Sequence, residues 1–187
     1  MSNPIKTLNN NAFEHAVKKV LENEGGFVNH KSDPGGATNY GISLRFLKST
    51  GIDIDLDGDT DIDDIIVLDK DDAKKIYKER WWDKHGYEKI NNIDIAAKIF
   101  DFSINAGSSQ AHKIAQSTAN EMGCGLICDG IFGKKSIDAI NGLIRQQKDK
   151  LYLNNYKRNL ARFYTRLAKS KPELNVFLKG WLRRAQE

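Results

Sequence analysis

Apolar residues recur along this chain mainly at positions three and four apart, the spacing of one helix face. The first such segment runs from Ala12 to Glu24, and a second begins near Asp69 and reaches the Trp81–Trp82 pair. Further helices are expected over residues 93–107, 109–122, 135–147 and 151–168. Residues 37–44 contain alternating, β-prone residues, which makes a short strand or hairpin plausible there. The pattern therefore predicts a mainly α fold with one small β or loop element.

The first helix places a carboxyl group on its apolar side. Phe13 and Glu24 are eleven positions apart, and at about 100° per residue they nearly eclipse each other. Gly25 and Gly26 follow and end the helix, as glycine commonly does. Burial raises the pKa of a carboxyl group, which then stays protonated and can act as a general acid. The alternative is a glutamate that extends into solvent, although an acid at a helix C-terminus is mildly unfavourable.

A second carboxylate, Asp33, follows in the turn sequence S-D-P-G-G. The commoner role of such an aspartate is to cap an Asx-turn. Thr38, Asn39 and Tyr40 come next, and a short strand or hairpin there would bring Asp33 and Thr38 back towards Glu24 across a cleft. We therefore predict an active site around these residues.

Composition and charge limit the classes of protein. The chain of 187 residues suits one domain, or one domain with an appendage. No apolar run reaches the length of about 18 residues that a membrane span needs. The N-terminus lacks the apolar core of a signal peptide, so we expect synthesis in the cytoplasm. Cys124 and Cys128 have no histidine close by, which argues against a zinc site; their pairing stays open.

The two parts of the chain carry opposite net charges. Residues 1–133 contain 15 Lys and Arg and 21 Asp and Glu, a net charge of −6. Residues 134–187 contain 14 Lys and Arg and 4 Asp and Glu, a net charge of +10. The basic part favours an anionic partner: nucleic acid, an acidic membrane or a cell-wall polymer. The solvated face of a long helix is an equal alternative.

Four sequence blocks together resemble one known family. They are E-G-G-F-V-N-H-K-S-D-P-G-G-A-T-N-Y-G-I-S at 24–43, E-R-W-W-D at 79–83, F-D-F-S-I-N-A-G at 100–107 and D-G-I-F-G at 129–133. They resemble glycoside hydrolase family 108, the N-acetylmuramidases found as phage endolysins and secretion-associated lysozymes. The resemblance implies a lysozyme-like helical fold with a small β or loop element beside the catalytic cleft. It also implies a catalytic region at 10–107 and a helical peptidoglycan-binding region at 108–187, packed as one compact unit.

The resemblance implies that Glu24 is the catalytic acid. A looser similarity to the Glu, Asp, Thr constellation of phage-type lysozymes implies that Asp33 and Thr38 are catalytic too. The threonine lies one residue away from its place in the phage-type spacing. Glycoside hydrolysis needs a proton for the leaving oxygen and a carboxylate for the cationic transition state or the water. Asp33 would stabilise the oxocarbenium-like centre or orient the water, and Thr38 would help to position that water. Retention or inversion of the anomer stays open.

Several further residues are expected to bind the glycan. Asn39 and Tyr40 lie beside the candidate catalytic residues in sequence. Two adjacent tryptophans cannot share one helix face, and we assign the exposed, sugar-stacking position to Trp82, with burial as the alternative. Asp101 and Asn105 are four positions apart and share a helix face. They either bond to sugar hydroxyl or acetamido groups or cap a neighbouring element.

Residues 53–64 include seven aspartates among twelve residues. If Asp53 is taken as position one of an EF-hand loop, the segment fits D-x-D-x-D-G with an acid, Asp64, at position twelve, where an EF-hand has glutamate. If Asp55 is taken as position one, Ile62 occupies the eighth position, which is apolar in an EF-hand. Such charge density favours a bound cation, and a solvated acidic loop is the alternative. We predict a structural calcium ion and no cofactor for the chemistry. The predicted ligands are Asp55, Asp57, Asp59 and Asp64.

The predicted function is hydrolysis of the β-1,4 bond between N-acetylmuramic acid and N-acetylglucosamine in peptidoglycan. The protein is expected to act as a monomer, in the periplasm or at the cell wall after release or export. A lytic transglycosylase is the alternative among enzymes, and a non-catalytic wall-binding module is the alternative from another class. Nucleic-acid binding has no supporting motif, and we expect no membrane insertion.

Overall fold

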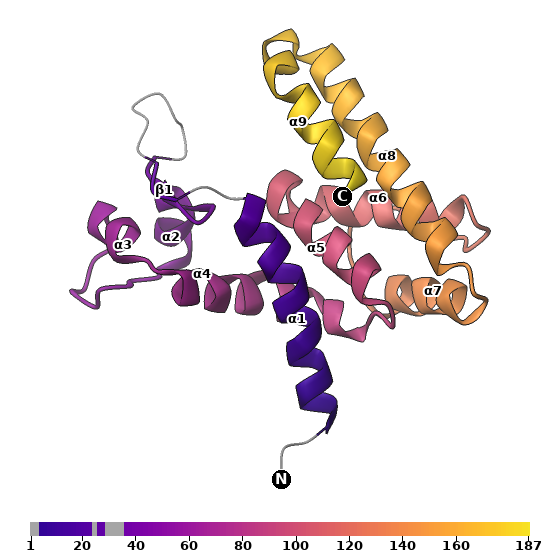
Figure 1. The fold of residues 1–187 in the computed structure, drawn as a ribbon, viewed down its shortest axis with the longest axis horizontal. Helices are drawn as coiled ribbons and strands as arrows, with labels where there is room; N and C mark the ends of the chain where they lie inside the picture. Colours follow the sequence, from indigo (N-terminus) through magenta and orange to yellow (C-terminus); the bar gives the residue numbers. More distant parts are fainter. Residues whose placement is uncertain (1–3, 24–25, 29–35) are drawn as a thin grey trace. The chain divides into compact units, whose positions relative to one another are not determined.

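The structure is a computed structural model that describes residues 4–23, 26–28 and 36–187. The chain divides into two compact units, Met1–Lys84 and His85–Glu187. Helices make up most of both units, and the small sheet seen in the described residues belongs to the first (Figure 1). The predicted mainly α fold with a small β element is confirmed.

The described part of the first unit contains one long helix, a short hairpin and several shorter helices that end in a π-helical turn. The elements are α1 (Pro4–Asn23), β1 (Thr38–Asn39), β2 (Ile42–Ser43), α2 (Leu44–Thr50), α3 (Ile62–Val67), α4 (Lys70–Tyr77) and η1 (Lys78–Asp83). Capping side chains set the starts of the short helices. Ser43 caps α2, and Asp61 and Asp69 form capping boxes at α3 and α4.

Helix α1 turns its apolar face inward, as the periodicity predicts. The ring of Phe13 meets Trp82 edge to face, with the ring centroids 5.7 Å apart. The helix begins at Pro4, well before the predicted start at Ala12. Proline suits a first turn because its missing N–H would have no helical partner there. The buried apolar positions of this face, all at most 3% exposed, are Phe13, Ala16, Val17 and Val20.

Strands β1 and β2 form an antiparallel hairpin whose turn residues are Tyr40 and Gly41. Their φ angles are 48° and 77°, and positive φ at both central residues is the requirement of a type I′ turn. Glycine adopts this conformation readily, whereas tyrosine does so at an energetic cost. The paired residues are Thr38 with Ser43 and Asn39 with Ile42.

All the regular elements of the second unit are helices. Its elements are η2 (Tyr87–Lys89), α5 (Ile93–Ala106), α6 (Ser108–Asn120), α7 (Lys134–Arg145), α8 (Asp149–Ser170), η3 (Pro172–Leu174) and α9 (Asn175–Gln186). Helices α8 and α9 lie side by side and are joined by η3 (Figure 1). The four helices predicted after residue 92 are confirmed, apart from small shifts at their ends, whereas α9 was not predicted.

Helix α5 is buried on almost every side, with residues 95–103 all inaccessible or nearly so. It packs against α6, α8 and η2 within the second unit. The compact units therefore divide before α5, after Lys84. The regions expected from sequence, 10–107 and 108–187, divide after it.

The D-G-I-F-G block forms a loop that two side chains of α6 hold in place. Gln116 accepts a hydrogen bond from the backbone N–H of Gly130 at 2.9 Å. His112 lies with Nδ1 3.1 Å from the Gly130 carbonyl oxygen and with Nε2 2.8 Å from the Tyr87 hydroxyl. Burial, together with His85, lowers the pKa of His112 to about 4. The neutral ring therefore donates from Nδ1 and accepts from Tyr87 at Nε2.

Candidate active site

The segment predicted to carry the chemistry is bordered by described residues. Glu24 and Asp33 themselves lie outside the described residues. In sequence, Glu24 directly follows Asn23, the last residue of α1. Val28 and Thr38 form an antiparallel bridge with two backbone hydrogen bonds of 2.8 Å. This bridge joins the two ends of the chain segment that includes Asp33.

Thr38 is the described member of the predicted catalytic set. Its backbone pairs with Val28 and with Ser43, and its side chain is half-buried. Because side chains alternate along a strand, Thr38 points to the face opposite Asn39. Backbone pairing to both neighbours fixes the position of this residue. Its role in orienting water stays a prediction.

Asn39 anchors the hairpin from its other face. The side chain is 7% exposed, and Nδ2 donates to the carbonyl oxygens of Ile65 at 3.1 Å and Leu68 at 3.0 Å. These acceptors lie in α3 and at its C-terminal end. Both amide hydrogens are thus used inside the unit, and only the side-chain oxygen could reach a glycan. The contact between Asn39 and glycan stays a prediction.

Tyr40 combines a strained backbone with a partly exposed side chain. Its carbonyl oxygen accepts a hydrogen bond from the buried Tyr77 hydroxyl at 2.9 Å. Backbone strain of this kind persists where surrounding contacts hold it, and it clusters at ligand-binding sites. Tyr40 therefore remains a candidate for contact with the glycan.

The structure corrects the expected exposure of the two tryptophans. Trp82 is 1% exposed and packs on Phe13, whereas Trp81 is half-buried. The Trp81 ring lies 5.0 Å from that of Phe46 and 5.6 Å from that of Tyr77, measured between centroids. Both tryptophans lie in the π-helical turn η1, whose i→i+5 bonding shifts the faces relative to an α-helix. A helical periodicity extended from α4 therefore assigns the exposed position to Trp82, whereas Trp81 is the more exposed of the two.

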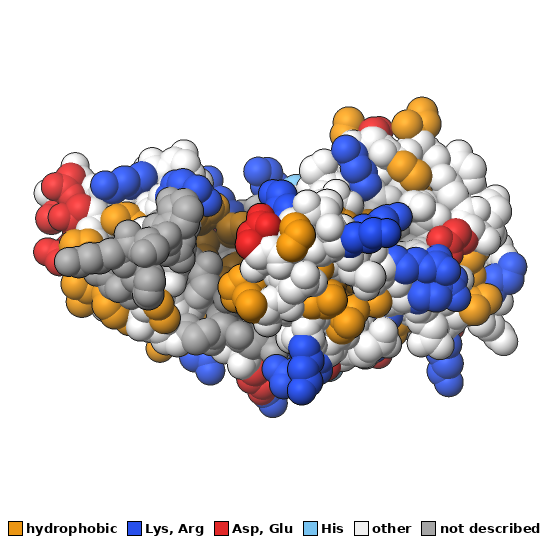
Figure 2. Space-filling model, turned by 90° about the horizontal axis from the view of Figure 1, so that it is seen from above, with side chains coloured by type: hydrophobic (Ala, Val, Ile, Leu, Met, Phe, Trp, Pro, Cys, Tyr) orange, Lys and Arg blue, Asp and Glu red, His pale blue; other side chains and the backbone are white. Residues whose placement is uncertain are grey.

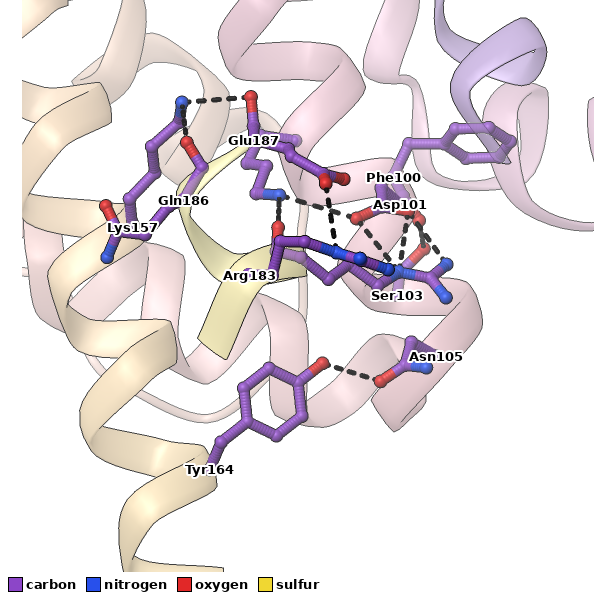
Figure 3. Close-up of polar contacts among 11 residues, drawn as sticks. Phe100, Asp101, Ser103, Asn105, Lys157, Tyr164, Arg183, Gln186 and Glu187 are labelled. Carbon is purple, nitrogen blue, oxygen red and sulfur yellow. Dashed lines mark hydrogen bonds and ion pairs between the residues drawn. The ribbon is translucent and has the colours of Figure 1, made fainter. Parts of the chain in front are cut away.

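Asp101 belongs to a buried cluster of charges in the second unit (Figure 3). Its carboxylate accepts from Arg184 Nη2 at 2.8 Å and Nε at 3.1 Å. Lys98 lies 3.6 Å from the same carboxylate and donates to the backbone carbonyl oxygen of Arg184. Burial lowers the pKa of Lys98, and attraction to Asp101 opposes that shift. The cluster fastens α9 to α5, and a contact between Asp101 and glycan stays a prediction.

Asn105 lies one turn after Asp101 on α5, but its side chain is exposed. Its Oδ1 accepts a hydrogen bond from the Tyr164 hydroxyl at 2.6 Å, and its amide nitrogen points away from Tyr164 (Figure 3). Sequence periodicity placed Asp101 and Asn105 on one face; the structure shows that one is enclosed and the other faces solvent.

Three aspartates of the acidic loop bring ligand atoms together. Oxygen atoms of Asp53, Asp55 and Asp57 lie within 4.8 Å of one another, an arrangement that could hold a cation. Asp53 was absent from the predicted ligand set, although it is position one of the first sequence register. Asp64 is buried and accepts backbone hydrogen bonds from Ile54 at 2.5 Å and Asp61 at 2.7 Å. Repulsion from Asp57 raises the pKa of Asp59.

A groove of about 480 Å³ lies between α1 and α4. It contains none of the predicted site residues. The Glu14–Lys74 salt bridge, at 3.2 Å, crosses it. Its lining residues are Glu14, His15, Lys18, Leu21, Glu22, Lys70 and Lys74.

Surface charge follows the sequence asymmetry. Acidic side chains gather at the left-hand end of the first unit in Figure 2, and Lys and Arg side chains are spread over the second unit. Across the described residues, we find no helix with the length and apolar character of a membrane span.

Comparison with known proteins identifies both parts of the chain. Residues 17–107 match the family Glycosyl hydrolase 108, and residues 110–186 match the family Predicted Peptidoglycan domain. The solved structure of Brucella abortus SagA is similar at 28% sequence identity and a TM-score of 0.73, covering 95% of this chain and 91% of that one. A search of curated protein sequences found no match. Residues 17–107 are therefore a glycosyl hydrolase 108 domain, and the chain is a peptidoglycan hydrolase in which this domain is followed by a predicted peptidoglycan domain.

Proposed function

We propose that the protein hydrolyses the β-1,4 bond between N-acetylmuramic acid and N-acetylglucosamine, with Glu24 as general acid. The match of residues 17–107 to the family is the observation that carries this proposal. The packing of α1 supports it, because Phe13, which periodicity aligns with Glu24, is buried. Glu24 itself lies outside the described residues; burial on that side of the helix would raise the pKa of its carboxyl group, as a general acid needs.

The remaining catalytic roles follow from the chemistry of the bond. Glu24 gives its proton to the glycosidic oxygen as the bond to the anomeric carbon breaks. Asp33 stabilises the positive charge that develops there or takes the proton of the attacking water. Thr38, fixed by its strand pairing to Val28 and Ser43, orients that water. Tyr40 and Asn105, which are at least partly exposed, contact the glycan.

Analysis of the products tests this function. Purified peptidoglycan digested with the protein is expected to give muropeptides with a reducing N-acetylmuramic acid end. Mass spectrometry separates this product from the 1,6-anhydro product of a lytic transglycosylase, which is lighter by one water. A reducing N-acetylglucosamine end, or anhydro products alone, would contradict the proposed reaction.

We also propose that the acidic loop binds a structural calcium ion. Asp53, Asp55 and Asp57 supply the oxygen ligands that calcium prefers. The loop is connected to α3 through Asp64, which accepts from the backbone N–H groups of Ile54 and Asp61. Helix α3 is connected to the hairpin through Asn39, which donates to carbonyl oxygens at the end of that helix. Calcium in the loop stabilises this connection and takes no part in bond cleavage.

Calcium is expected to raise the melting temperature of the protein. At a concentration about 100 times its dissociation constant, a ligand that binds only the folded state stabilises it by about 2.7 kcal/mol. Differential scanning fluorimetry with calcium, with magnesium and with EDTA measures the effect. Asp55→Asn should remove the calcium dependence while the melting temperature in EDTA changes little. Equal melting temperatures in calcium and EDTA would show that the loop is a solvated acidic segment.

The predicted peptidoglycan domain supports action at the cell wall. We propose that the protein acts there as a monomer after release or export. Size-exclusion chromatography with light scattering tests the monomer, and a mass near twice 21.1 kDa would contradict it.

A further inference from the structure

Tyr164 of α8 is enclosed by aromatic rings in the second unit. It is 2% exposed. Its ring stacks on Trp181 of α9, with centroids 5.1 Å apart and planes 19° apart. Phe102 of α5 meets the same ring edge to face, with centroids 5.6 Å apart. Contacts from two other helices therefore fix the direction of the phenolic O–H.

The fixed O–H points at the amide of Asn105. The distance from the Tyr164 hydroxyl to Oδ1 is 2.6 Å, which is typical of O–H···O and short for N–H···O. The oxygen of the amide therefore lies towards Tyr164. Burial raises the pKa of Tyr164, so the phenol stays protonated and donates.

This contact leaves the Asn105 nitrogen directed away from the aromatic cluster (Figure 3). The side chain is exposed, so the two N–H groups are accessible from solvent. An isolated asparagine at a helix end can rotate its amide to offer either oxygen or nitrogen. Here the hydrogen bond from Tyr164 holds the amide oxygen, so that only the two N–H groups of Asn105 face solvent as hydrogen-bond donors.

We propose that Tyr164 is a positioning residue that orients the Asn105 amide so that its N–H groups bind an acceptor oxygen of the glycan, the acetamido carbonyl of an N-acetylated sugar. This proposal rests on the proposed function, in which Asn105 contacts the glycan. It assigns to α8, within the predicted peptidoglycan domain, a part in selecting N-acetylated substrate. A hydrogen bond held in one geometry favours the sugar that has the acceptor over the sugar that lacks it.

Tyr164→Phe tests the positioning role, with Tyr156→Phe as the matched control. Both tyrosines are buried on α8, and Tyr156 donates to the backbone oxygen of Ala111 at 3.3 Å. Tyr164→Phe is expected to raise KM for soluble peptidoglycan fragments about five- to tenfold, the usual value of one hydrogen bond. The value of kcat should change less than twofold, about the scatter of such comparisons. An equal KM in the two variants would overturn the proposal.

A double-mutant cycle with Asn105→Ala shows whether Tyr164 acts through Asn105. Tyr164→Phe should have no further effect on KM in the Asn105→Ala background, because the amide that it orients is gone. Independent, additive effects of the two substitutions would contradict the mechanism. The preference of wild type for N-acetylated over de-N-acetylated glycan should fall in Tyr164→Phe, and an unchanged preference would rule out the acetamido group as ligand.

Calorimetric binding of N-acetylated glycan oligomers separates this proposal from the proposed function. The Kd comparison among wild type, Tyr164→Phe and Tyr156→Phe needs no turnover. If wild type binds the oligomers but releases no muropeptide, the proposed reaction fails while the Tyr164 comparison still decides the positioning role. If Tyr164→Phe and Tyr156→Phe bind them as tightly as wild type, the positioning role fails and the reaction can still stand.

Discussion

Glu24→Gln is expected to lower the rate of peptidoglycan hydrolysis by about 10²- to 10⁴-fold, the usual contribution of a general acid. Glutamine has nearly the same shape as glutamic acid but carries no acidic proton for the leaving oxygen. Turbidity clearance of cell-wall suspensions measures the rate. Co-sedimentation with insoluble peptidoglycan measures binding, which should be retained because the second domain is unchanged.

Glu22→Gln is the matched control for this experiment. Glu22 lies in α1, two residues before Glu24, its side chain is 64% exposed, and it pairs with Lys18 at 3.9 Å. Its loss should leave activity within about twofold, as for surface substitutions away from a site. Wild-type clearance by Glu24→Gln would refute the enzymatic role of Glu24 and favour the wall-binding alternative.

Asp101→Ala is expected to lower the free energy of unfolding by about 3–5 kcal/mol, because it removes the buried carboxylate that two buried cations share. Arg184 and Lys98 both lie within 3.6 Å of the lost carboxylate, and all three side chains are 8–15% exposed. Urea denaturation followed by circular dichroism measures the change as a shift in midpoint at constant slope.

Asp138→Ala provides the comparison for an exposed ion pair. Asp138 lies 2.5 Å from Lys134, but the two side chains are 57% and 87% exposed. Exposed pairs contribute at most about 1 kcal/mol, so this variant should unfold close to wild type. If Asp101→Ala cost no more than Asp138→Ala, the buried cluster would not be what fastens α9 to α5.

Sequence periodicity predicted the long helices that bury a regular apolar face and missed the short helices α2 and α3 as well as α9. Phe13, Ala16 and Val17 mark α1 clearly, and all are buried. In α9 only Ala185 is fully buried. That helix is held by Arg184 reaching Asp101 and by Trp181 stacking on Tyr164, contacts between residues far apart in sequence. No local pattern contains such contacts.

In the candidate site, too, the contacts that the sequence could not predict join residues far apart in the chain. Sequence analysis assigned Asn39 and Asp101 to glycan binding, and the structure shows both bonded to protein groups at least 26 and 83 residues away. A buried polar side chain needs partners, and the sequence does not say whether protein or ligand supplies them. The aspartate spacing alone contained the information that Asp53 belongs with Asp55 and Asp57, since all three fit the first register of the loop pattern.

The position of α5 restricts how these two domains can be recombined in evolution or in engineering. By sequence, α5 belongs to the hydrolase match that ends at residue 107. By packing, it forms part of the unit that begins at His85. In a chimaera that joins residues 1–107 of this chain to the C-terminal domain of another protein, α5 would come from this chain and the helices around it from the other. The nine buried residues of α5 would then pack against helices with which they did not evolve. A junction between Lys84 and His85 transfers α5 together with the helices that enclose it, so the functional module is longer than the family boundary suggests.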